Sequence, residues 1–248
     1  MHADFLVPVI IFFGSLIYGT FGFGDAMFAM PFLSTIIGIK TATPLMTLNG
    51  CTMALFLFIK HYKEIDWKAA RKLVIASCFG IPIGIFFLKN GNESITKIIL
   101  GVIIMGVSIY NLFIRKEQHA HKLPSGLVYV FGFVAGILGG AFNTGGPPIV
   151  IFGTLSGWTQ MRFVSTLQGY FLPSDLFILS GQLMAGLLTK NVLHYYIISL
   201  PFLLSAVLIG SQLRKKIPAG KFNRYIFMLL LLVGLVFLVR SVLALLSL

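Results

Sequence analysis

Charged residues are scarce in this chain. They make up only 10% of its 248 residues, whereas 57% are hydrophobic and the mean hydropathy is +0.95. A soluble domain carries about 25% charged residues, which keep its surface wet. Most of this surface must therefore face something other than water. That excludes an ordinary soluble protein and indicates a single all-α polytopic membrane domain.

Cysteine and acidic residues are also few, and the Cys, His and acidic residues present form no recognisable catalytic or metal-binding pattern. Cys51 and Cys78 show no CxxC or Cys/His spacing, so we expect neither a metal site nor a cofactor. No nucleophile–base pattern appears either, and we do not expect an enzyme. The net charge of +12 comes from Lys and Arg in loops between apolar segments, where such residues set membrane orientation. Nucleic acid is therefore not an expected partner.

Six stretches are apolar and long enough to cross a membrane, which takes about 20 residues of helix. They are residues 42–59, 73–88, 97–114, 164–187, 192–212 and 225–246.

Two further apolar stretches, 4–37 and 124–154, are each longer than 30 residues. Gly19–Gly24 breaks the first, and Gly139–Pro148 breaks the second. In a helix interior glycine costs about 1 kcal/mol and proline about 3 kcal/mol. Each stretch is therefore either one kinked helix or a broken, re-entrant hairpin.

The distribution of basic residues favours the hairpins. If both stretches cross once, the loop Lys and Arg divide 9 to 9 between the two sides, leaving out Arg240 in the last span. If both are hairpins, the loops at 60–72, 115–122, 162 and 214–224 share one side with 14, and 4 remain on the other. The second division fits the positive-inside rule. We therefore predict a cytoplasmic 14-charge side, with both termini outside.

The two halves of the chain resemble each other. Residues 21–28 align with 142–149 at an offset of 121, and residues 47–50 align with 166–169 at an offset of 119. Each half then holds one hairpin and three spans. Because three is odd, the second half starts on the opposite membrane face, which makes the repeats inverted.

The predicted domains are these two repeats, residues 1–122 and 123–248, which together form one membrane domain. Inverted repeats with broken helices are the usual build of secondary transporters, with the binding site between the breaks near the midplane.

The residues around the two breaks suit an anion. Half-helix N-termini carry unpaired N–H groups and a positive dipole end, which bind oxyanions without a buried Lys or Arg. No Lys or Arg lies near either break in the sequence, and the glycines let a ligand approach the backbone. Pro147 and Pro148 suit the first turn of a helix. The alternative is that the glycines only permit tight helix packing. The candidate substrate-binding residues are Gly22, Phe23, Gly24, Asp25, Asn49, Asn143, Thr144, Gly145, Gly146 and Gln168.

Asp25 and Asp175 are the acids that fall within apolar segments, and both are candidates for proton coupling. A carboxylate in the membrane is costly and indicates function, and a desolvated carboxyl group holds its proton more strongly. Asp175 follows Gln168 by seven residues, two helical turns, so the two share a face. For Asp25, capping of a half-helix is an equal alternative. For Asn49 and Gln168 the alternative is interhelical hydrogen bonding.

The second break also carries a family resemblance. Residues 136–148 resemble the second signature of the TauE/SafE sulfite exporter family, and the first break followed by Pro31 resembles its first. Asp25 stands where a further glycine is frequent in that family. The resemblance covers the whole chain in length, segment count and duplication. It implies a transporter of sulfite, thiosulfate or organosulfonates in the bacterial inner membrane, and it leaves the direction of transport open.

We thus expect alternating access around a midplane anion site. The expected partners are a small anion, the lipid bilayer and a coupling proton or sodium ion, and assembly into a homo-oligomer is left open. An anion channel of the same architecture is the alternative function, and fast conductive flux would distinguish it from slow, saturable transport. A scaffold without transport is a further alternative.

Overall fold

The computed structural model describes residues 2–110, 124 and 126–216, together with five isolated positions between 228 and 239. Every regular element within these residues is a helix. The all-α prediction is therefore confirmed for this part of the chain. The predicted loop 115–122 and most of the predicted span 225–246 lie outside it.

The helices of the first half include one short 3₁₀ helix, η1, between α3 and α4. They are α1 (His2–Phe21), α2 (Asp25–Ile36), α3 (Ile39–His61), η1 (Tyr62–Glu64), α4 (Trp67–Asn90) and α5 (Glu93–Ile109). The described helices of the second half repeat the order long, short, long, long. They are α6 (Leu127–Phe142), α7 (Gly146–Leu155), α8 (Gln160–Met184) and α9 (Lys190–Lys216).

Both long stretches are interrupted in their middle. Residues 22–24 separate α1 from α2, and residues 143–145 separate α6 from α7. Gly22 and Gly24 have φ angles of 82° and 97°, a left-handed region that glycine enters without a Cβ clash. Asn143 has φ 54°, which asparagine tolerates better than most residues. The chain can therefore turn sharply at both places.

The second interruption is narrower than the sequence predicted. α6 continues through Gly139 and Gly140 to Phe142, because backbone hydrogen bonds outweigh the low helix propensity of single glycines. Pro147 and Pro148 lie in the first turn of α7, as predicted, where a missing N–H costs little.

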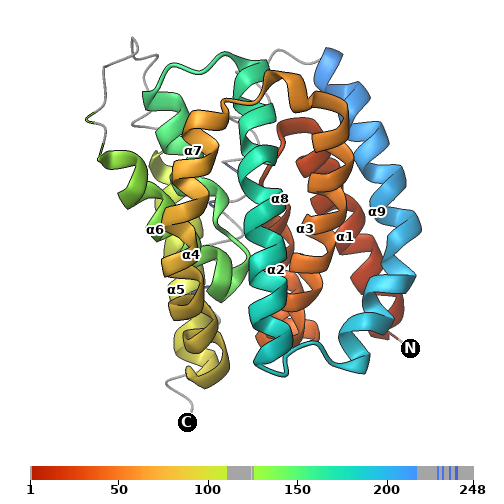
Figure 1. Ribbon diagram of the computed structural model, residues 1–248. Coiled ribbons are helices and arrows are strands. Elements are labelled where there is room, and N and C mark those ends of the chain that lie inside the picture. The colour runs from red at the N-terminus through yellow and green to blue at the C-terminus, as the bar shows by residue number, and fades with distance from the viewer. Residues whose placement is uncertain are drawn as a thin grey trace.

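The two hairpins point into the bundle from opposite ends (Figure 1). α1 starts and α2 ends at the lower end of that view, whereas α6 starts and α7 ends toward its upper end. The connections from α3 to α4 and from α7 to α8 lie at the upper end, and the connection from α8 to α9 lies at the lower end. The interrupted regions of the two hairpins consequently approach each other inside the bundle.

Each hairpin packs its longer helix against a helix of the other half. α1 packs chiefly against α9, α6 packs chiefly against α4, and α3 and α8 cross between these pairs. Glycines allow the backbones to approach: a Cβ atom at Gly19 would lie 2.7 Å from the carbonyl oxygen of Val207. Small residues at helix contacts are typical of membrane proteins. The halves are thus interlocked rather than laid side by side.

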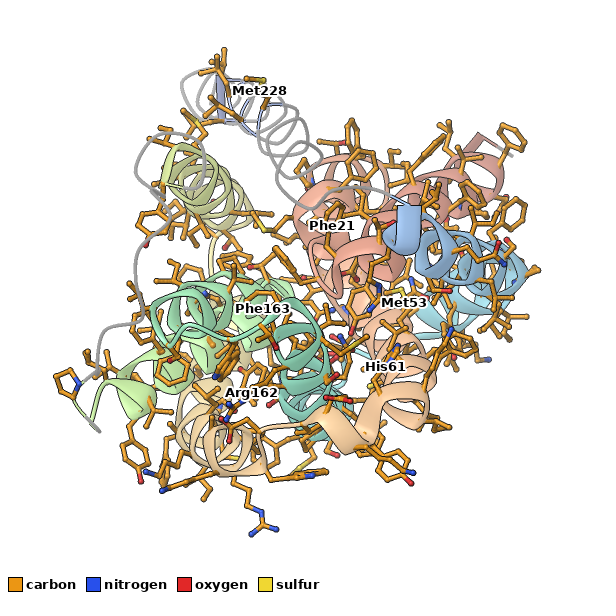
Figure 2. The ribbon with its side chains drawn as sticks, turned by 90° about the horizontal axis from the view of Figure 1, so that it is seen from above. Phe21, Met53, His61, Arg162, Phe163 and Met228 are labelled. Atoms are coloured by element: carbon orange, nitrogen blue, oxygen red, sulfur yellow. The ribbon has the colours of Figure 1, made fainter. Side chains whose placement is uncertain are left out.

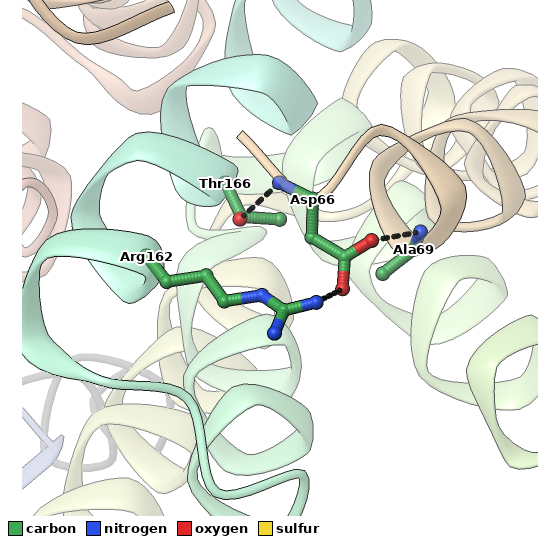
Figure 3. A network of polar contacts seen from close by, with 4 residues as sticks. All are labelled: Asp66, Ala69, Arg162 and Thr166. Carbon is green, nitrogen blue, oxygen red and sulfur yellow. Dashed lines mark hydrogen bonds and ion pairs between the residues drawn. The ribbon is translucent and has the colours of Figure 1, made fainter. Parts of the chain in front are cut away.

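A polar network also joins the two halves at the upper end (Figure 3). Asp66 caps α4 by accepting a hydrogen bond from the backbone N–H of Ala69 at 3.2 Å. Its other carboxylate oxygen pairs with Arg162 on α8 at 2.6 Å, and its own N–H donates to the Thr166 hydroxyl at 3.0 Å. The start of α4 is therefore fixed to the start of α8.

Four described helices are long and apolar enough to cross a membrane, namely residues 3–21, 39–64, 67–90 and 190–214. The first of these is α1, so the first hairpin joins a helix of spanning length to the 12-residue α2. α8 is 25 residues long but carries more polar residues. Viewed from above, apolar side chains project outward around the rim (Figure 2). Phe79 and Phe86 of α4 are about 70% exposed. This apolar exterior fits a lipid environment.

Candidate functional site

A cavity lies where the two interruptions meet. Its walls come from the ends of α1 and α6, the starts of α2 and α7, and the middles of α3 and α8. The cavity is small: the centre of a water molecule can move within about 30 Å³ of it. One water needs about half of that volume. A larger ligand therefore requires the walls to move apart.

The first interruption contributes Phe23, Gly24 and Asp25 to the wall. Gly24 occupies the N-cap position of α2, and no side-chain cap hydrogen bond is present there. Asp25 is the first residue of the helix and is buried, with one carboxylate oxygen, Oδ2, lacking a hydrogen-bond partner. Gly24 rather than Asp25 thus occupies the N-cap position, and the carboxyl group of Asp25 interacts with the backbone N–H of Ala26 in the first turn. It brings an unpaired polar atom to the cavity.

The second interruption contributes Asn143, Thr144, Gly145 and Gly146. Thr144 is 2% exposed, and its hydroxyl has no hydrogen-bond partner among the described residues. A Cβ atom at Gly146 would lie 3.7 Å from the Cβ of Phe23. The two interruptions, over a hundred residues apart in sequence, are therefore in direct contact.

The middles of α3 and α8 complete the wall with Gly50 and Asp175. A Cβ atom at Gly50 would lie 2.9 Å from Oδ2 of Asp175 and 3.5 Å from Nδ2 of Asn143. The absence of a side chain at Gly50 consequently leaves room for that carboxylate and amide. Ser174 also lines the cavity and lies 3.3 Å from the hydroxyl of Ser77 on α4, within hydrogen-bond distance.

Gln168 and Gly22 lie beside the cavity, outside its wall. The Gln168 amide donates to the carbonyl oxygen of Gly22 at 3.1 Å, and its own oxygen accepts from the Tyr18 hydroxyl at 2.7 Å. Both hydrogen bonds are buried. Gln168 therefore holds the backbone of the first interruption in place, whereas Tyr18 itself reaches the cavity wall.

Asn49 stands apart from the other candidate residues. It is completely buried on α3, it does not line the cavity, and neither polar atom of its amide has a hydrogen-bond partner among the residues that the structure describes. Its repeat equivalent, Gln168, makes two hydrogen bonds. Burial of an amide without hydrogen-bond partners is unfavourable. No contact among the described residues explains why Asn49 is buried in this way.

Sequence reasoning missed three contributions to this site. Tyr18 and Tyr170 line the cavity. In the sequence they resemble core residues on the apolar face of a helix, because a tyrosine that lines a cavity has the same helical spacing as one in the core. Arg214 was assigned to a loop. It instead reaches back from α9 and donates to the carbonyl oxygen of Gly19 at 3.0 Å, close to the first interruption. No Lys or Arg lies near the first break in the sequence, but the fold brings Arg214 close to it in space.

Known proteins give the context for this geometry. The family model described as sulfite exporter TauE/SafE matches residues 7–237 of the chain. The chain belongs to the TauE/SafE sulfite exporter family. Among curated proteins, a probable sulfite/organosulfonate exporter TauE of Cupriavidus necator is 24% identical over 163 residues. That match covers 60% of this TauE/SafE chain and 62% of the relative's length, less than two thirds of it. No solved structure matches the chain.

The cavity of this TauE/SafE protein combines groups of opposite polarity. The starts of α2 and α7 supply two positive helix ends, and Asp25 and Asp175 supply two carboxyl groups. The described lining contains no Lys or Arg. The described residues also hold no group of three or more His, Cys, Asp or Glu side chains arranged for a metal ion. Two helix N-termini and two carboxyl groups therefore meet at one cavity.

Proposed function

We propose that this protein is a secondary transporter of a small sulfur-containing anion such as sulfite, thiosulfate or an organosulfonate. The observation that carries the proposal is the meeting of two half-helix N-termini at one central cavity, with unpartnered atoms of Asp25 and Thr144 at its wall. N–H groups at such helix ends bind oxyanions. The name of the Cupriavidus necator relative supports the sulfur chemistry.

The binding site lies between two inverted repeats, residues 1–122 and 123–248. Contacts of the small residues support this. A Cβ atom at Gly19 would meet the carbonyl oxygen of Val207, and one at Gly140 would meet that of Ile81. Gly19 and Gly140 differ by 121, the offset already seen at the interruptions, while Val207 and Ile81 differ by 126.

A second pair of contacts follows the same offsets. A Cβ atom at Gly210 would meet the carbonyl oxygen of Leu16, and one at Gly84 would meet that of Ile137. Leu16 and Ile137 again differ by 121, and Gly210 and Gly84 by 126. The α1–α9 contact is therefore repeated as the α6–α4 contact, as a two-fold axis in the membrane plane requires.

Alternating access follows from this symmetry. α1 with α9 and α6 with α4 form two tightly packed pairs, and the cavity lies between them with α3 and α8. Rocking of one pair against the other opens the cavity to one membrane face at a time. The basic loops 60–72 and 162 lie at the upper end in Figure 1, and we assign that end to the cytoplasm.

Anion binding is coupled to proton uptake in this mechanism. With Asp25 and Asp175 ionised, a bound anion would be a third negative charge in a small, poorly solvated space, which Coulomb repulsion opposes. Protonation of one carboxyl group removes that repulsion and gives the site a proton to carry with the anion. Asp25 and Asp175 are the candidates because both line the cavity.

The test is counterflow in proteoliposomes that contain the full chain. Vesicles loaded with unlabelled sulfite should accumulate labelled sulfite from outside, and thiosulfate and methanesulfonate should compete. Exchange at a saturable rate meets the expectation. Fast conductive flux would show a channel instead, and the absence of flux for all three anions would refute the proposal.

A further inference from the structure

Arg214 of α9 is a partly buried basic residue beside the end of α1. Its Nη2 atom donates to the carbonyl oxygen of Gly19 at 3.0 Å, in the last turn of α1 and three residues before Gly22. Its Nε atom is buried and has no hydrogen-bond partner among the described residues. One donor of the guanidinium is thus used, and another is kept away from water without a partner.

A purely structural role accounts for part of this arrangement. The last carbonyl groups of a helix lack intrahelical partners, and a cation near the C-terminus satisfies them and the helix dipole. That role explains the bond to Gly19. It does not explain the buried Nε atom, since leaving a charged group's donor unpaired away from water is unfavourable.

The pseudo-symmetry shows that fold requirements alone do not call for an arginine here. The offset of 126 that relates Gly210 to Gly84 and Val207 to Ile81 relates Arg214 to Leu88. Leu88 is 1% exposed and apolar. The equivalent contact in the other half is therefore built without a cation. The positive charge of Arg214 therefore makes the two ends of the cavity different. Packing between two symmetric halves does not require such a difference.

Arg214 also lies on the end of the bundle that holds other basic groups. It is near the C-terminal end of α9, which Figure 1 shows at the upper end, beside the α3–α4 connection. His61, the last residue of α3, interacts electrostatically with Arg214. Arg214 and His61 thus lie together at this end of the bundle, close to the end of α1.

We propose that Arg214 binds the transported oxyanion at the upper, cytoplasmic opening and passes it to the half-helix ends. The inference rests on the proposed function and deepens it. The unpartnered Nε–H of Arg214 can donate a charge-assisted hydrogen bond to one oxygen of a sulfite or sulfonate group. A cation at this end should lower the concentration of anion needed for capture from the cytoplasmic face.

The test compares two preparations of membrane vesicles, everted and right-side-out, that contain the full chain. We expect Arg214→Gln to raise the KM for labelled sulfite about tenfold in everted vesicles, the loss of one charged hydrogen-bonded contact. The KM in right-side-out vesicles should stay unchanged. Added salt should slow uptake by the unsubstituted chain in everted vesicles and should have little effect on Arg214→Gln, because screening weakens the attraction between an approaching anion and the guanidinium. Arg214→Lys should fall between the two.

The matched control is Lys190→Gln, which removes an exposed positive charge from the opposite end of the same helix. It should leave the KM in everted vesicles unchanged. Equal KM changes in both preparations would indicate that Arg214 only holds the end of α1, and would overturn the inference. A change confined to right-side-out vesicles would overturn it as well.

Thermal stabilisation of the purified full chain by sulfite and by sulfate tests Arg214 without transport. The unsubstituted chain should be stabilised, and Arg214→Gln should lose most of that stabilisation while keeping its unliganded Tm within a few degrees. If stabilisation depends on Arg214 but no vesicle transports sulfite, the proposed function fails and the anion site stands. Equal stabilisation of the unsubstituted chain and of Arg214→Gln would show that Arg214 does not bind the anion, and would overturn the inference.

Discussion

At the scale of single residues, the cavity depends on positions where a side chain is missing or unusually placed. Gly50 leaves room for the carboxylate of Asp175, and Asn143 accepts a left-handed backbone that ends α6. Gln168 holds Gly22 by a hydrogen bond. These residues differ in what they contribute, so substitutions should separate backbone geometry from ligand contact.

Asn143 offers such a separation. Glycine adopts φ 54° freely and lacks the amide, so Asn143→Gly should keep the fold but weaken sulfite-induced thermal stabilisation. Asn143→Ala should weaken it equally and also lower stability by about 1 kcal/mol through backbone strain. Both effects are measured by thermal unfolding of purified protein with and without sulfite. Undiminished stabilisation in Asn143→Gly would remove the amide from the binding site.

Gly50→Ala tests the space beside Asp175. The added methyl group would lie 2.9 Å from Oδ2 of Asp175 and would push that carboxylate into the cavity. We expect the KM for sulfite to rise severalfold with the Tm little changed, since a carboxylate end can shift more easily than backbone. Gly106→Ala, where nothing lies within 4 Å, is the control and should change neither value. An unaltered KM in Gly50→Ala would show that this part of the cavity is not used.

At the scale of secondary-structure elements, the decisive feature is the close packing of α1 with α9 and of α6 with α4. Backbone rather than side chains forms these contacts, at Gly19 and Gly210 in one pair and Gly84 and Gly140 in the other. Such contacts tolerate no added volume, because the opposing backbone cannot rotate away. They make each helix pair a unit that can move as a rigid body.

Equivalent glycines of the two pairs should respond alike. Gly84→Ala and Gly210→Ala should each lower stability by about 1–3 kcal/mol through overpacking, although alanine favours helix. Gly106→Ala serves again as control and should be neutral or slightly stabilising. Thermal or denaturant unfolding in detergent measures all three. A large loss in Gly84→Ala beside none in Gly210→Ala would contradict the repeat symmetry.

At the scale of the whole molecule, two oppositely inserted hairpins enclose one cavity that has acidic groups and no basic side chain in its described wall. Neither half could form this site alone, since each provides one helix N-terminus and one carboxyl group. The proposed coupling between anion and proton would thus require the assembled bundle.

Asp175→Asn tests this coupling. The neutral amide removes the repulsion against the anion but cannot carry a proton, so exchange should persist while the response to a pH gradient is lost. Methanesulfonate is the suitable probe, because its own charge does not change near neutral pH. Flux in proteoliposomes is measured with and without an imposed pH gradient, and Asp175→Glu should keep part of the response.

Asp66→Asn, at the upper-end network and away from the cavity, is the control and should respond to pH as the unsubstituted chain does. A full pH response in Asp175→Asn would shift the coupling role to Asp25. No response of the unsubstituted chain to a pH gradient, together with a response to a sodium gradient, would make sodium the coupling ion.

The sequence by itself determined the class of the protein and the places where its helices break. The low charge and apolar stretches require helices in a membrane, since only satisfied backbone is stable in lipid. Glycine and proline act locally, so Gly22, Gly24 and Pro147 could be assigned to the breaks without knowledge of packing. The repeat of residues 21–28 at 142–149 is also a local pattern and was visible in the sequence.

Only the tertiary structure decided which side chains meet. The contact of Gly146 with Phe23, the place of Gly50 beside Asp175 and the bond from Arg214 to Gly19 join residues far apart in the chain. Such contacts depend on how helices cross, which hydropathy and spacing do not encode. Gln168 shows the difference: its equivalence to Asn49 was visible in the sequence, but its bond to Gly22 was not. The physical reason is that helix packing depends on two helices together, whereas helix propensity depends on the sequence of one segment alone.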